Sequence, residues 1–303
     1  MINVELKGGA VKEFENGTTP AEIAKSIGAG LYKSVCCAKV DGDLCDLRTP
    51  LEKDCKVELL TFDNVDGQKT FWHTASHVLA QAVKRLYPNA KCAIGPAVDN
   101  GFYYDFDVEK PFSPEDLEKI KAEMKKIVKS GLELERVELS PEEAEKKLEE
   151  MNEPYKVELV KEHSDKGEHI TFYKQGEFID LCAGPHLMSV APIKAIELTA
   201  CTGAYWRGDA NNAQLCRVYG VAFPKASMLE EHLKKLEEAK LRDHNKLGRE
   251  LEYFTTVDYV GQGLPILLPK GARVVQLLQR WVEDVEQSKG CLLTKTPLPV
   301  SYT

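Results

Sequence analysis

Alternating apolar and polar side chains dominate the first part of the chain and predict β-strands there. Gly8 and Gly9 separate the first two alternating runs, which predicts a β-hairpin at the start of the protein. Thr19-Pro20-Ala21-Glu22 combines a capping box with proline at the first helical position, so a short helix is expected to follow. Two strands, a helix and then further strands are typical of a small β-grasp module. The predicted strands are residues 2–6, 11–14, 35–40 and 57–62.

The apolar spacing changes to a helical period at Thr70. From there to Tyr87, apolar residues recur every three or four positions, which predicts a buried amphipathic helix that Pro88 ends. Ser-Pro-Glu segments at residues 113–115 and 140–142 predict the starts of two more helices, whose charged faces lie in solvent. A polar connecting helix and a strongly amphipathic helix are predicted at residues 225–246 and 272–287.

Short apolar and aromatic runs between Tyr155 and Gly220 alternate with glycine and proline, as in an antiparallel sheet. Together with the helix that starts at Thr70, they predict one α+β domain. A strand is expected at residues 264–268, and another is expected to begin after Gly290. The predicted fold class is therefore α+β with several domains. The runs that predict the sheet are residues 156–160, 170–173, 178–181 and 196–199.

The composition is that of an ordinary globular protein, with 43% hydrophobic and 29% charged residues among 303. The 48 acidic and 40 basic side chains give a formal net charge of -8, so nucleic acid would have to bind at a local site. Nine cysteines without a CxxC pair fit neither a disulfide framework nor a zinc ribbon. No apolar run reaches the ~20 residues of a membrane span and the start lacks a signal-peptide core, so we expect a cytoplasmic protein without a membrane partner.

Two short motifs carry side chains suited to chemistry. His73 and His77 are four residues apart on a predicted helix, so both imidazoles can reach one metal ion or one substrate. Asp180, Cys182 and His186 surround a Gly-Pro turn at the end of a predicted strand, where sheets commonly expose reactive groups. Together these motifs supply three histidines and a cysteine. Such a set suits either tetrahedral zinc coordination or an acid/base cluster around a water molecule.

Four segments together resemble the editing domain of the threonyl-tRNA synthetases, a module shared in part with the alanyl-tRNA synthetases. The resemblance implies a TGS-type β-grasp domain over residues 1–62, an editing domain over 63–224, a linker helix over 225–245 and the start of a class II catalytic domain over 246–303. Pro297 falls where the proline of class II motif 1 would lie. The segments that carry the editing-domain resemblance are HTASH (73–77), AIGPAVDNGFYYDF (93–106), DLCAGPH (180–186) and TGAYWRGDANN (202–212).

The resemblance implies an aminoacyl-tRNA hydrolase that removes serine from mischarged seryl-tRNA for threonine. Its partners would be tRNA(Thr) and that seryl ester. His73 is expected to activate or orient water, Lys156 to stabilise the oxyanion, and Asp180 to orient the substrate or the lysine. The full set that the resemblance implies comprises the catalytic residues His73, His77, Lys156, Asp180, Cys182 and His186, the last two shaping the pocket, and Tyr104 as a contact for the substrate or the terminal nucleotide.

A zinc ion held by His73, His77, Cys182 and His186 is the rival account of the same cluster. The resemblance to the threonyl rather than the alanyl enzymes favours hydrolysis that requires no cofactor. It implies ATP, magnesium and zinc only for the catalytic core, and a homodimer for the complete enzyme. Since most of that core does not follow within these residues, we expect the chain not to charge tRNA by itself. A noncatalytic tRNA- or partner-binding fragment and an unrelated zinc-binding module stay open as alternatives.

Overall fold

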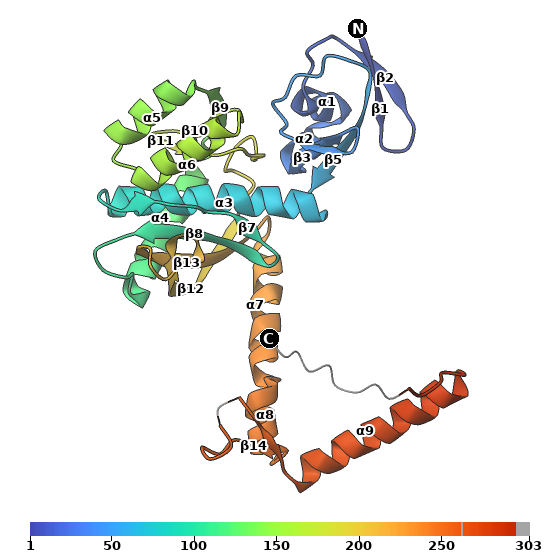
Figure 1. The fold of residues 1–303 in the computed structure, drawn as a ribbon. Coiled ribbons are helices and arrows are strands. Elements are labelled where there is room, and N and C mark those ends of the chain that lie inside the picture. The colour runs from blue at the N-terminus through green and yellow to red at the C-terminus, as the bar shows by residue number, and fades with distance from the viewer. Residues whose placement is uncertain (262, 295–303) are drawn as a thin grey trace. The chain divides into compact units, whose positions relative to one another are not determined.

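The computed structural model describes residues 1–261 and 263–294 (Figure 1). It separates into two compact units, Met1–Glu231 and a second unit that begins at His232. Residues 291–294 are not in a strand, and Pro297 lies outside the described residues. Three mixed or antiparallel sheets with their helices build the first unit, which confirms the predicted α+β class.

A five-stranded sheet with the order β2-β1-β5-β3-β4 forms the amino-terminal domain. β1 pairs antiparallel with β2, which confirms the predicted hairpin, and parallel with β5, which requires the intervening crossover through the helices. The predicted capping box is present, because the Thr19 side chain and Glu22 satisfy each other's backbone N–H groups. Val4, Ile23 and Val57 are fully buried between sheet and helix. The elements are β1 (Ile2–Leu6), β2 (Val11–Phe14), α1 (Pro20–Ile27), α2 (Ala29–Ser34), β3 (Val35–Val40), β4 (Asp43–Cys45) and β5 (Cys55–Thr61).

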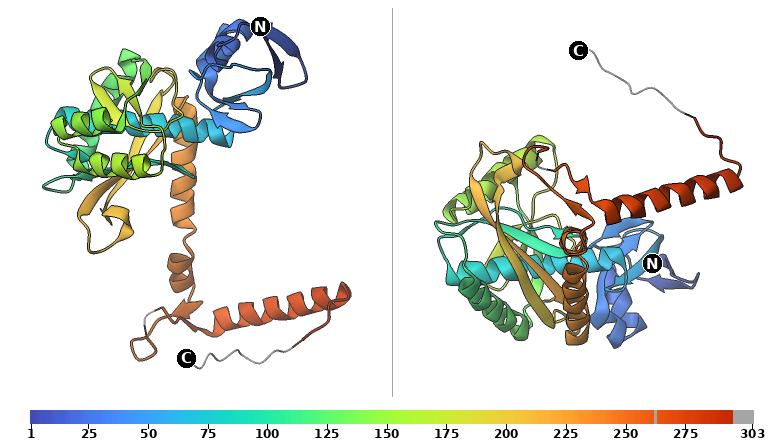
Figure 2. Two further views of the ribbon diagram at one scale, coloured as in Figure 1. Left: turned by 45° about the horizontal axis from the view of Figure 1, so that its top comes forward. Right: turned by 90° about the horizontal axis from the view of Figure 1, so that it is seen from below.

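Helix α3 (Val65–Leu86) runs between two sheets in the next domain (Figures 1 and 2). It begins before the predicted start at Thr70, because the Asn64 side chain accepts a hydrogen bond from the Asp66 backbone N–H and caps the helix there. Side chains around most of its circumference are buried, as expected of a helix with packing partners on opposite sides. α3 is therefore a rigid support for the side chains that it carries.

One face of α3 packs against a second sheet with the strand order β12-β13-β8-β6, in which β7 also pairs with β8. The Trp72 indole N–H donates to the carbonyl of Ala222 on β13 and ties the helix to this sheet. α4 packs against both α3 and β12, and the predicted helix start at Ser113 is confirmed, with a capping box between Ser113 and Asp116. The elements are β6 (Lys91–Cys92), β7 (Ala97–Val98), β8 (Gly101–Asp107), α4 (Pro114–Ser130), β12 (Ala195–Tyr205) and β13 (Gln214–Phe223).

A three-stranded antiparallel sheet with the order β11-β10-β9 and two helices complete this domain. The prediction of a strand at residues 156–160 is wrong, because these residues lie in α6. Pro154 occupies the first turn of that helix, and the apolar residues Val157 and Val160 are three apart, a spacing that helices share. The elements are β9 (Leu134–Glu138), α5 (Pro141–Glu150), α6 (Pro154–Asp165), β10 (Thr171–Gln175) and β11 (Phe178–Leu181).

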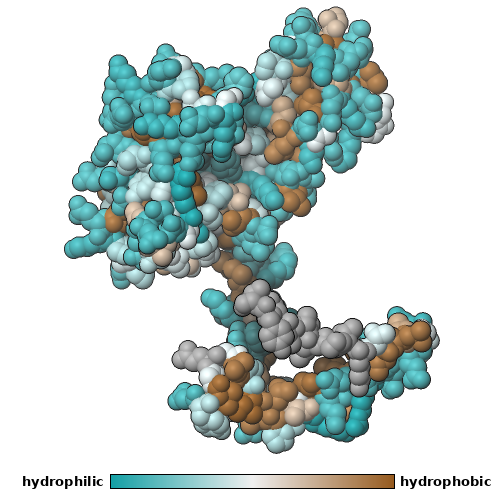
Figure 3. Space-filling view, viewed as in Figure 1, coloured by the Kyte–Doolittle hydropathy of each residue, from teal (hydrophilic) through white to brown (hydrophobic). Residues whose placement is uncertain are grey.

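The remaining segment, in the part that the structure describes, contains three helices and two short strands. The single helix predicted at residues 225–246 is two helices, because the Asp243 side chain accepts a hydrogen bond from Lys246 N–H and starts a new one. The predicted amphipathic helix is confirmed as α9, and apolar side chains along it, including Leu277 and Leu278, are exposed in the described chain (Figure 3). The elements are α7 (Ala226–Leu241), α8 (His244–Glu250), β14 (Phe254–Thr255), β15 (Ile266–Leu267) and α9 (Pro269–Ser288). Among the described helices, none is long and apolar enough to cross a lipid bilayer.

Candidate active site

The two motifs that the sequence singled out meet beside α3. His73 and His77 project from one side of this helix, with their ring centroids 5.4 Å apart. Cys182 and His186, on the loop after β11, lie at the same place. One ligating atom from each of the four side chains lies within 4.8 Å of the others. The histidine pair and the Gly-Pro turn therefore form one cluster, although more than 100 residues separate them in the sequence.

Cys182 lies at the centre of this cluster. Its Sγ is 3.1 Å from Nε2 of His73 and 3.2 Å from Nε2 of His186. The backbone N–H of Gly184 donates to the same sulfur at 3.3 Å. Gly184 has a φ of +74°, and a Cβ there would lie 2.3 Å from the Tyr173 hydroxyl. Only glycine fits this turn, which holds the sulfur between the two imidazoles.

The hydrogen bonds of Thr74 determine which nitrogen of His186 carries the proton. The Thr74 hydroxyl donates its single proton to the Thr70 carbonyl at 3.0 Å, and it lies 3.2 Å from Nδ1 of His186. His186 Nδ1–H is therefore the donor to Thr74, and its Nε2 presents a lone pair toward Cys182. Burial, and then the neighbouring His73 and His77, lower the pKa of His186 well below its usual range. This ring is neutral at physiological pH.

His73 is also neutral, although its surroundings differ. Burial lowers its pKa from 6.5 to about 4, while a hydrogen bond to the Pro185 backbone and the charge of Asp180 act in the opposite direction. A neutral imidazole at this position can accept a hydrogen bond from water or from a hydroxyl group.

Lys156 and Asp180 form a buried ion pair next to the histidines. Lys156 Nζ on α6 lies 2.8 Å from Oδ1 of Asp180 on β11. Burial alone lowers the pKa of Lys156, but the attraction of Asp180 more than offsets this and the net shift is upward. For the carboxyl group of Asp180, burial alone raises the pKa, but its interactions with Lys156 and His77 more than offset this and the net shift is downward. Both groups are therefore charged at pH 7.

Tyr104 supports this pair from the neighbouring sheet. Its hydroxyl donates to Oδ2 of Asp180 at 2.6 Å, and its side chain is fully buried in the core. A Cβ on Gly95 would lie 2.1 Å from the Tyr104 ring, so the glycine permits this close packing. The structure thus places Tyr104 behind Asp180. The contact with substrate that the sequence resemblance implied stays a prediction.

A cavity of about 370 Å³ opens beside the cluster, a size suited to a small-molecule group. His73, His77, Lys156, Asp180 and Cys182 all line it, so five of the six predicted catalytic residues face one space. The sixth, His186, lies behind Cys182 and is fully buried.

Sequence reasoning assigned no role to two further residues that line this cavity, His163 and His169. His163 Nδ1 lies 2.5 Å from Oε2 of Glu168, which also lines the cavity. These residues come from the end of α6 and from the loop after it, and no motif links them to the histidines of α3. The only signal that finds them is their position in the fold.

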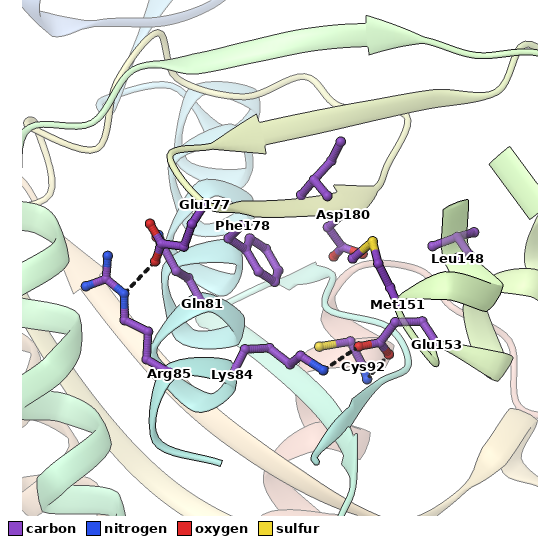
Figure 4. Close-up of a pocket in the computed structure, with 11 residues that line it drawn as sticks. Gln81, Lys84, Arg85, Cys92, Leu148, Met151, Glu153, Glu177, Phe178 and Asp180 are labelled. Atoms are coloured by element: carbon purple, nitrogen blue, oxygen red, sulfur yellow. Dashed lines mark hydrogen bonds and ion pairs between the residues drawn. The ribbon is translucent and has the colours of Figure 1, made fainter. Parts of the chain in front are cut away.

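A second cavity, of about 270 Å³, shares Asp180 with the first (Figure 4). Its charged side chains are paired with one another: Lys84 Nζ lies 2.8 Å from Glu153, and Arg85 Nε lies 2.6 Å from Glu177. Glu153 also accepts the Cys92 backbone N–H at 2.6 Å. Because these groups satisfy each other, they are better explained as structural, and the histidine-lined cavity is the stronger candidate for chemistry.

The four clustered side chains form a donor set that fits a zinc ion. Three imidazoles and one thiol are ordinary ligands for tetrahedral zinc. Thr74 and the Pro185 backbone hold His186 and His73 in the way that outer groups hold metal-binding histidines. Nδ1 of His77 is buried and has no hydrogen-bond partner among the described residues. The cluster can therefore hold a metal ion, and without one it offers the neutral imidazole of His73 at the cavity.

Comparison with known proteins assigns two segments to domain families. Residues 2–61 match the TGS domain, and residues 170–219 match the threonyl and alanyl tRNA synthetase second additional domain. The first match covers the β-grasp sheet, and the second contains Asp180, Cys182 and His186.

Nearly the whole chain is similar to threonine–tRNA ligases. It is 58% identical to the enzyme of Clostridium perfringens (strain ATCC 13124) over 298 residues, which are 98% of this chain and 46% of the relative. It is 53% identical to the enzyme of Clostridium tetani and 52% identical to that of Acetivibrio thermocellus, each over 98% of this chain, and it covers 46% and 47% of those relatives. The chain thus spans about half the length of the curated relatives it matches, and it corresponds to their amino-terminal region.

Proposed function

We propose that this chain, which is similar to the amino-terminal region of threonine–tRNA ligases, hydrolyses the ester bond of seryl-tRNA(Thr). The observation that carries the proposal is one cavity lined by a neutral His73, a charged Lys156 and their partners, in a chain that matches the second additional domain of these synthetases. Such a cavity offers a hydrogen-bond acceptor for water and a fixed cation for a developing oxyanion.

The chemistry of threonine explains why such a hydrolase is needed. Serine lacks one methyl group of threonine, and a missing methyl is worth only about 1–3 kcal/mol in a binding site. An enzyme that charges tRNA with threonine therefore makes errors with serine, and a second site must remove them. We infer that the cavity beside His73 accepts the seryl group and excludes the extra methyl by shape.

In this mechanism, His73 orients the attacking water. Because its pKa is about 4, the neutral ring is a weak base at pH 7, so holding the water, directly or through the terminal ribose hydroxyl, suits it better than full proton removal. The water oxygen bonds to the ester carbonyl carbon and the bond to the ribose oxygen breaks. The ribose oxygen leaves with a proton that comes from the water, and free serine is released.

Lys156 stabilises the negative charge that develops on the carbonyl oxygen. Its raised pKa keeps it protonated, and its burial strengthens the interaction because little water screens it. Asp180 holds the ammonium group in place and is itself held by Tyr104. Cys182 and His186 shape the wall behind His73, and His77 lies between His73 and Asp180.

Hydrolysis in this proposal requires no metal ion. If zinc binds, His73, His77, Cys182 and His186 would hold it. It would then polarise the ester carbonyl or lower the pKa of a bound water. The role of His73 in orienting water belongs to the metal-free account, because a nitrogen bound to zinc cannot also accept a hydrogen bond. The two accounts differ in what a chelator does.

The complete enzyme that contains such a region is proposed to attach threonine to tRNA(Thr) with ATP, as a homodimer in the cytoplasm. The name of the relatives, threonine–tRNA ligase, supports the charging reaction, whereas the dimer and the location rest on the sequence resemblance. We propose that the described part of the chain carries the editing site and that charging depends on the remainder of that enzyme.

The residues are tested by single substitutions in the full chain. His73→Ala and Lys156→Ala are each expected to reduce seryl-tRNA(Thr) hydrolysis at least ~100-fold, since each removes a group from the reacting centre. His244→Ala, at the start of α8, is the matched control and is expected to retain the wild-type rate. Full activity in a folded His73→Ala or Lys156→Ala variant would remove that residue from the mechanism. A wild-type chain that binds tRNA without turnover would instead favour a noncatalytic binding fragment.

A further inference from the structure

The segment after β4 in the β-grasp domain contacts the loop that carries His186. Asp46 and Arg48 lie in this segment and are mostly buried, with side chains 7% and 14% exposed. His186, which both of them contact, is 140 residues from Asp46 and 138 residues from Arg48 in sequence. The contact joins the TGS match at residues 2–61 to the second additional domain match at 170–219.

Asp46 accepts hydrogen bonds from two groups of the editing domain. Its Oδ2 accepts the backbone N–H of His186 at 3.1 Å and the hydroxyl of Tyr173 at 2.9 Å. Its Oδ1 accepts from Arg48 at 3.0 Å, so both carboxylate oxygens are used. Bonds to a charged acceptor are about twice as strong as those between neutral groups, and these are shielded from water.

Arg48 holds the carbonyl side of the same loop. Its Nη2 donates to the carbonyl of Leu187 at 2.7 Å, its Nη1 to that of His186 at 3.3 Å, and its Nε to that of Leu134 on β9 at 3.0 Å. The planar guanidinium reaches all three because its N–H groups form a rigid fork. The N–H and the carbonyl of His186 are thus both bound by the β-grasp domain.

Anchoring the His186 backbone fixes the position of its ring. The ring lies 4.4 Å from Tyr173 and 4.2 Å from His73, measured between centroids, and its Nε2 faces the Cys182 sulfur. A shift of the His186 backbone would therefore move the His186 ring, against which His73 and Cys182 pack. Displacements of about 1 Å can reduce a reaction rate ~100-fold.

We propose that Asp46 and Arg48 of the β-grasp domain are positioning residues of the hydrolytic site, which is complete only when this domain is docked on the His186 loop. Their effect on turnover rests on the proposed seryl-tRNA hydrolysis. Their effect on the loop itself does not, and this difference allows the two proposals to fail separately.

Asp46→Asn in the full chain tests the proposal with two readouts. The variant keeps the shape of the side chain but places an amide N–H₂ group against the donors that surround it. Amide hydrogen exchange is expected to become faster in residues 182–190, and kcat for seryl-tRNA(Thr) to fall roughly 10- to 100-fold, with KM changed less than about threefold. Asp54→Asn is the matched control, because Asp54 in the same domain accepts the Asn3 backbone N–H at 2.8 Å, away from the editing loop. It is expected to change neither readout.

A folded Asp46→Asn chain that exchanges and hydrolyses like Asp54→Asn overturns the proposal. If the wild-type chain hydrolyses nothing, the proposed function fails, and exchange alone decides whether Asp46 holds the loop. If Asp46→Asn does not fold, Arg48→Lys replaces it as the test. Lysine keeps the charge but cannot reach three carbonyls, so faster exchange and a lower kcat support the proposal, whereas wild-type values overturn it.

Discussion

Lys156 Nζ and Asp180 Oδ1 lie 2.8 Å apart, and their side chains are only 5% and 4% exposed. A buried pair of this kind is costly to form and costly to break, because either charge alone would remain in a poorly solvated place. The pair is formed between α6 and β11, so it also joins two elements of the domain. Because both residues also line the histidine-lined cavity, loss of the pair is expected to affect both the stability of the domain and the proposed hydrolysis.

Removing one partner of this pair is expected to destabilise the fold. Lys156→Ala leaves Asp180 charged and buried, so the free energy of unfolding should fall by about 3–5 kcal/mol. Lys161→Ala is a matched control on the same helix, since Lys161 is 57% exposed and lies 3.9 Å from Glu145. That change should cost less than about 1 kcal/mol. Urea-induced unfolding measures the free energy of unfolding of both variants. Equal decreases in the two would show that the Lys156–Asp180 pair contributes no more to stability than an exposed ion pair.

The rate of hydrolysis should be nearly independent of pH in the range where histidines usually titrate. Because the pKa of His73 is lowered from 6.5 to about 4, the ring stays neutral between pH 5.5 and 8. We expect the catalysed rate, after subtraction of the uncatalysed rate, to change less than about twofold over this range. A histidine with the ordinary pKa would lose about tenfold at pH 5.5. A rate that falls with a midpoint near pH 6.5 would contradict this assignment.

The same pKa shift predicts the direction in which stability changes with pH. Between pH 6.5 and about 4, the unfolded chain binds a proton at His73 that the folded chain does not. The contribution of His73 to stability is therefore fully present above pH 6.5 and is lost as pH falls through about 4. His186, whose pKa is also lowered, acts in the same direction. Unfolding of the wild type and of His73→Gln at several pH values measures this contribution, and identical slopes in the two would contradict it.

Treatment with a chelator separates the metal-free account from the zinc account. If hydrolysis needs only the protein's own side chains, the chelated chain should retain its rate within about twofold. Zinc content measured before and after treatment confirms that the metal has been removed, and Cys182→Ser should lower any zinc that does bind. Loss of activity on chelation, with recovery at one zinc ion per chain, would instead establish zinc as the agent that activates water.

The packing of Gly95 against Tyr104 predicts a substitution effect outside the histidine cluster. A Cβ at Gly95 would lie 2.1 Å from the Tyr104 ring, so Gly95→Ala should destabilise the chain by about 1–3 kcal/mol and weaken hydrolysis by displacing Asp180's partner. Gly30→Ala on helix α2 meets nothing within 4 Å and serves as the control. It should be neutral or stabilise by up to about 1 kcal/mol. Similar effects of both changes on unfolding would contradict the packing argument.

Local signals in the sequence predicted the parts of the fold that depend on nearby residues. The capping boxes at Thr19, Ser113 and Ser140 are all present, because each requires only a side chain and a backbone group three residues apart. The spacing of His73 and His77 placed both on one face of a helix for the same reason. The four-residue histidine spacing and the strand-end turn were enough to suggest a shared site.

The type of element formed by a short apolar run, and contacts between residues far apart in sequence, could not be predicted from these local signals. Residues 156–160 are too few to distinguish a strand from a helix by period alone. The prediction of a strand there was therefore wrong, and Lys156 lies on α6. Asp46 and His163 lie in no motif, and only the folded chain brings them to the His186 loop and the cavity. Their importance follows from tertiary contacts that a single sequence does not encode locally.

The most direct test of the central claim is a time course of ester loss from seryl-tRNA(Thr) and threonyl-tRNA(Thr), each incubated with the purified chain. We predict rapid loss of the seryl ester, while the threonyl ester disappears at the uncatalysed rate, because the cavity excludes the additional methyl group. Equal loss of both esters would contradict the proposed discrimination. Loss of neither, with a chain shown to be folded, would contradict the hydrolase itself.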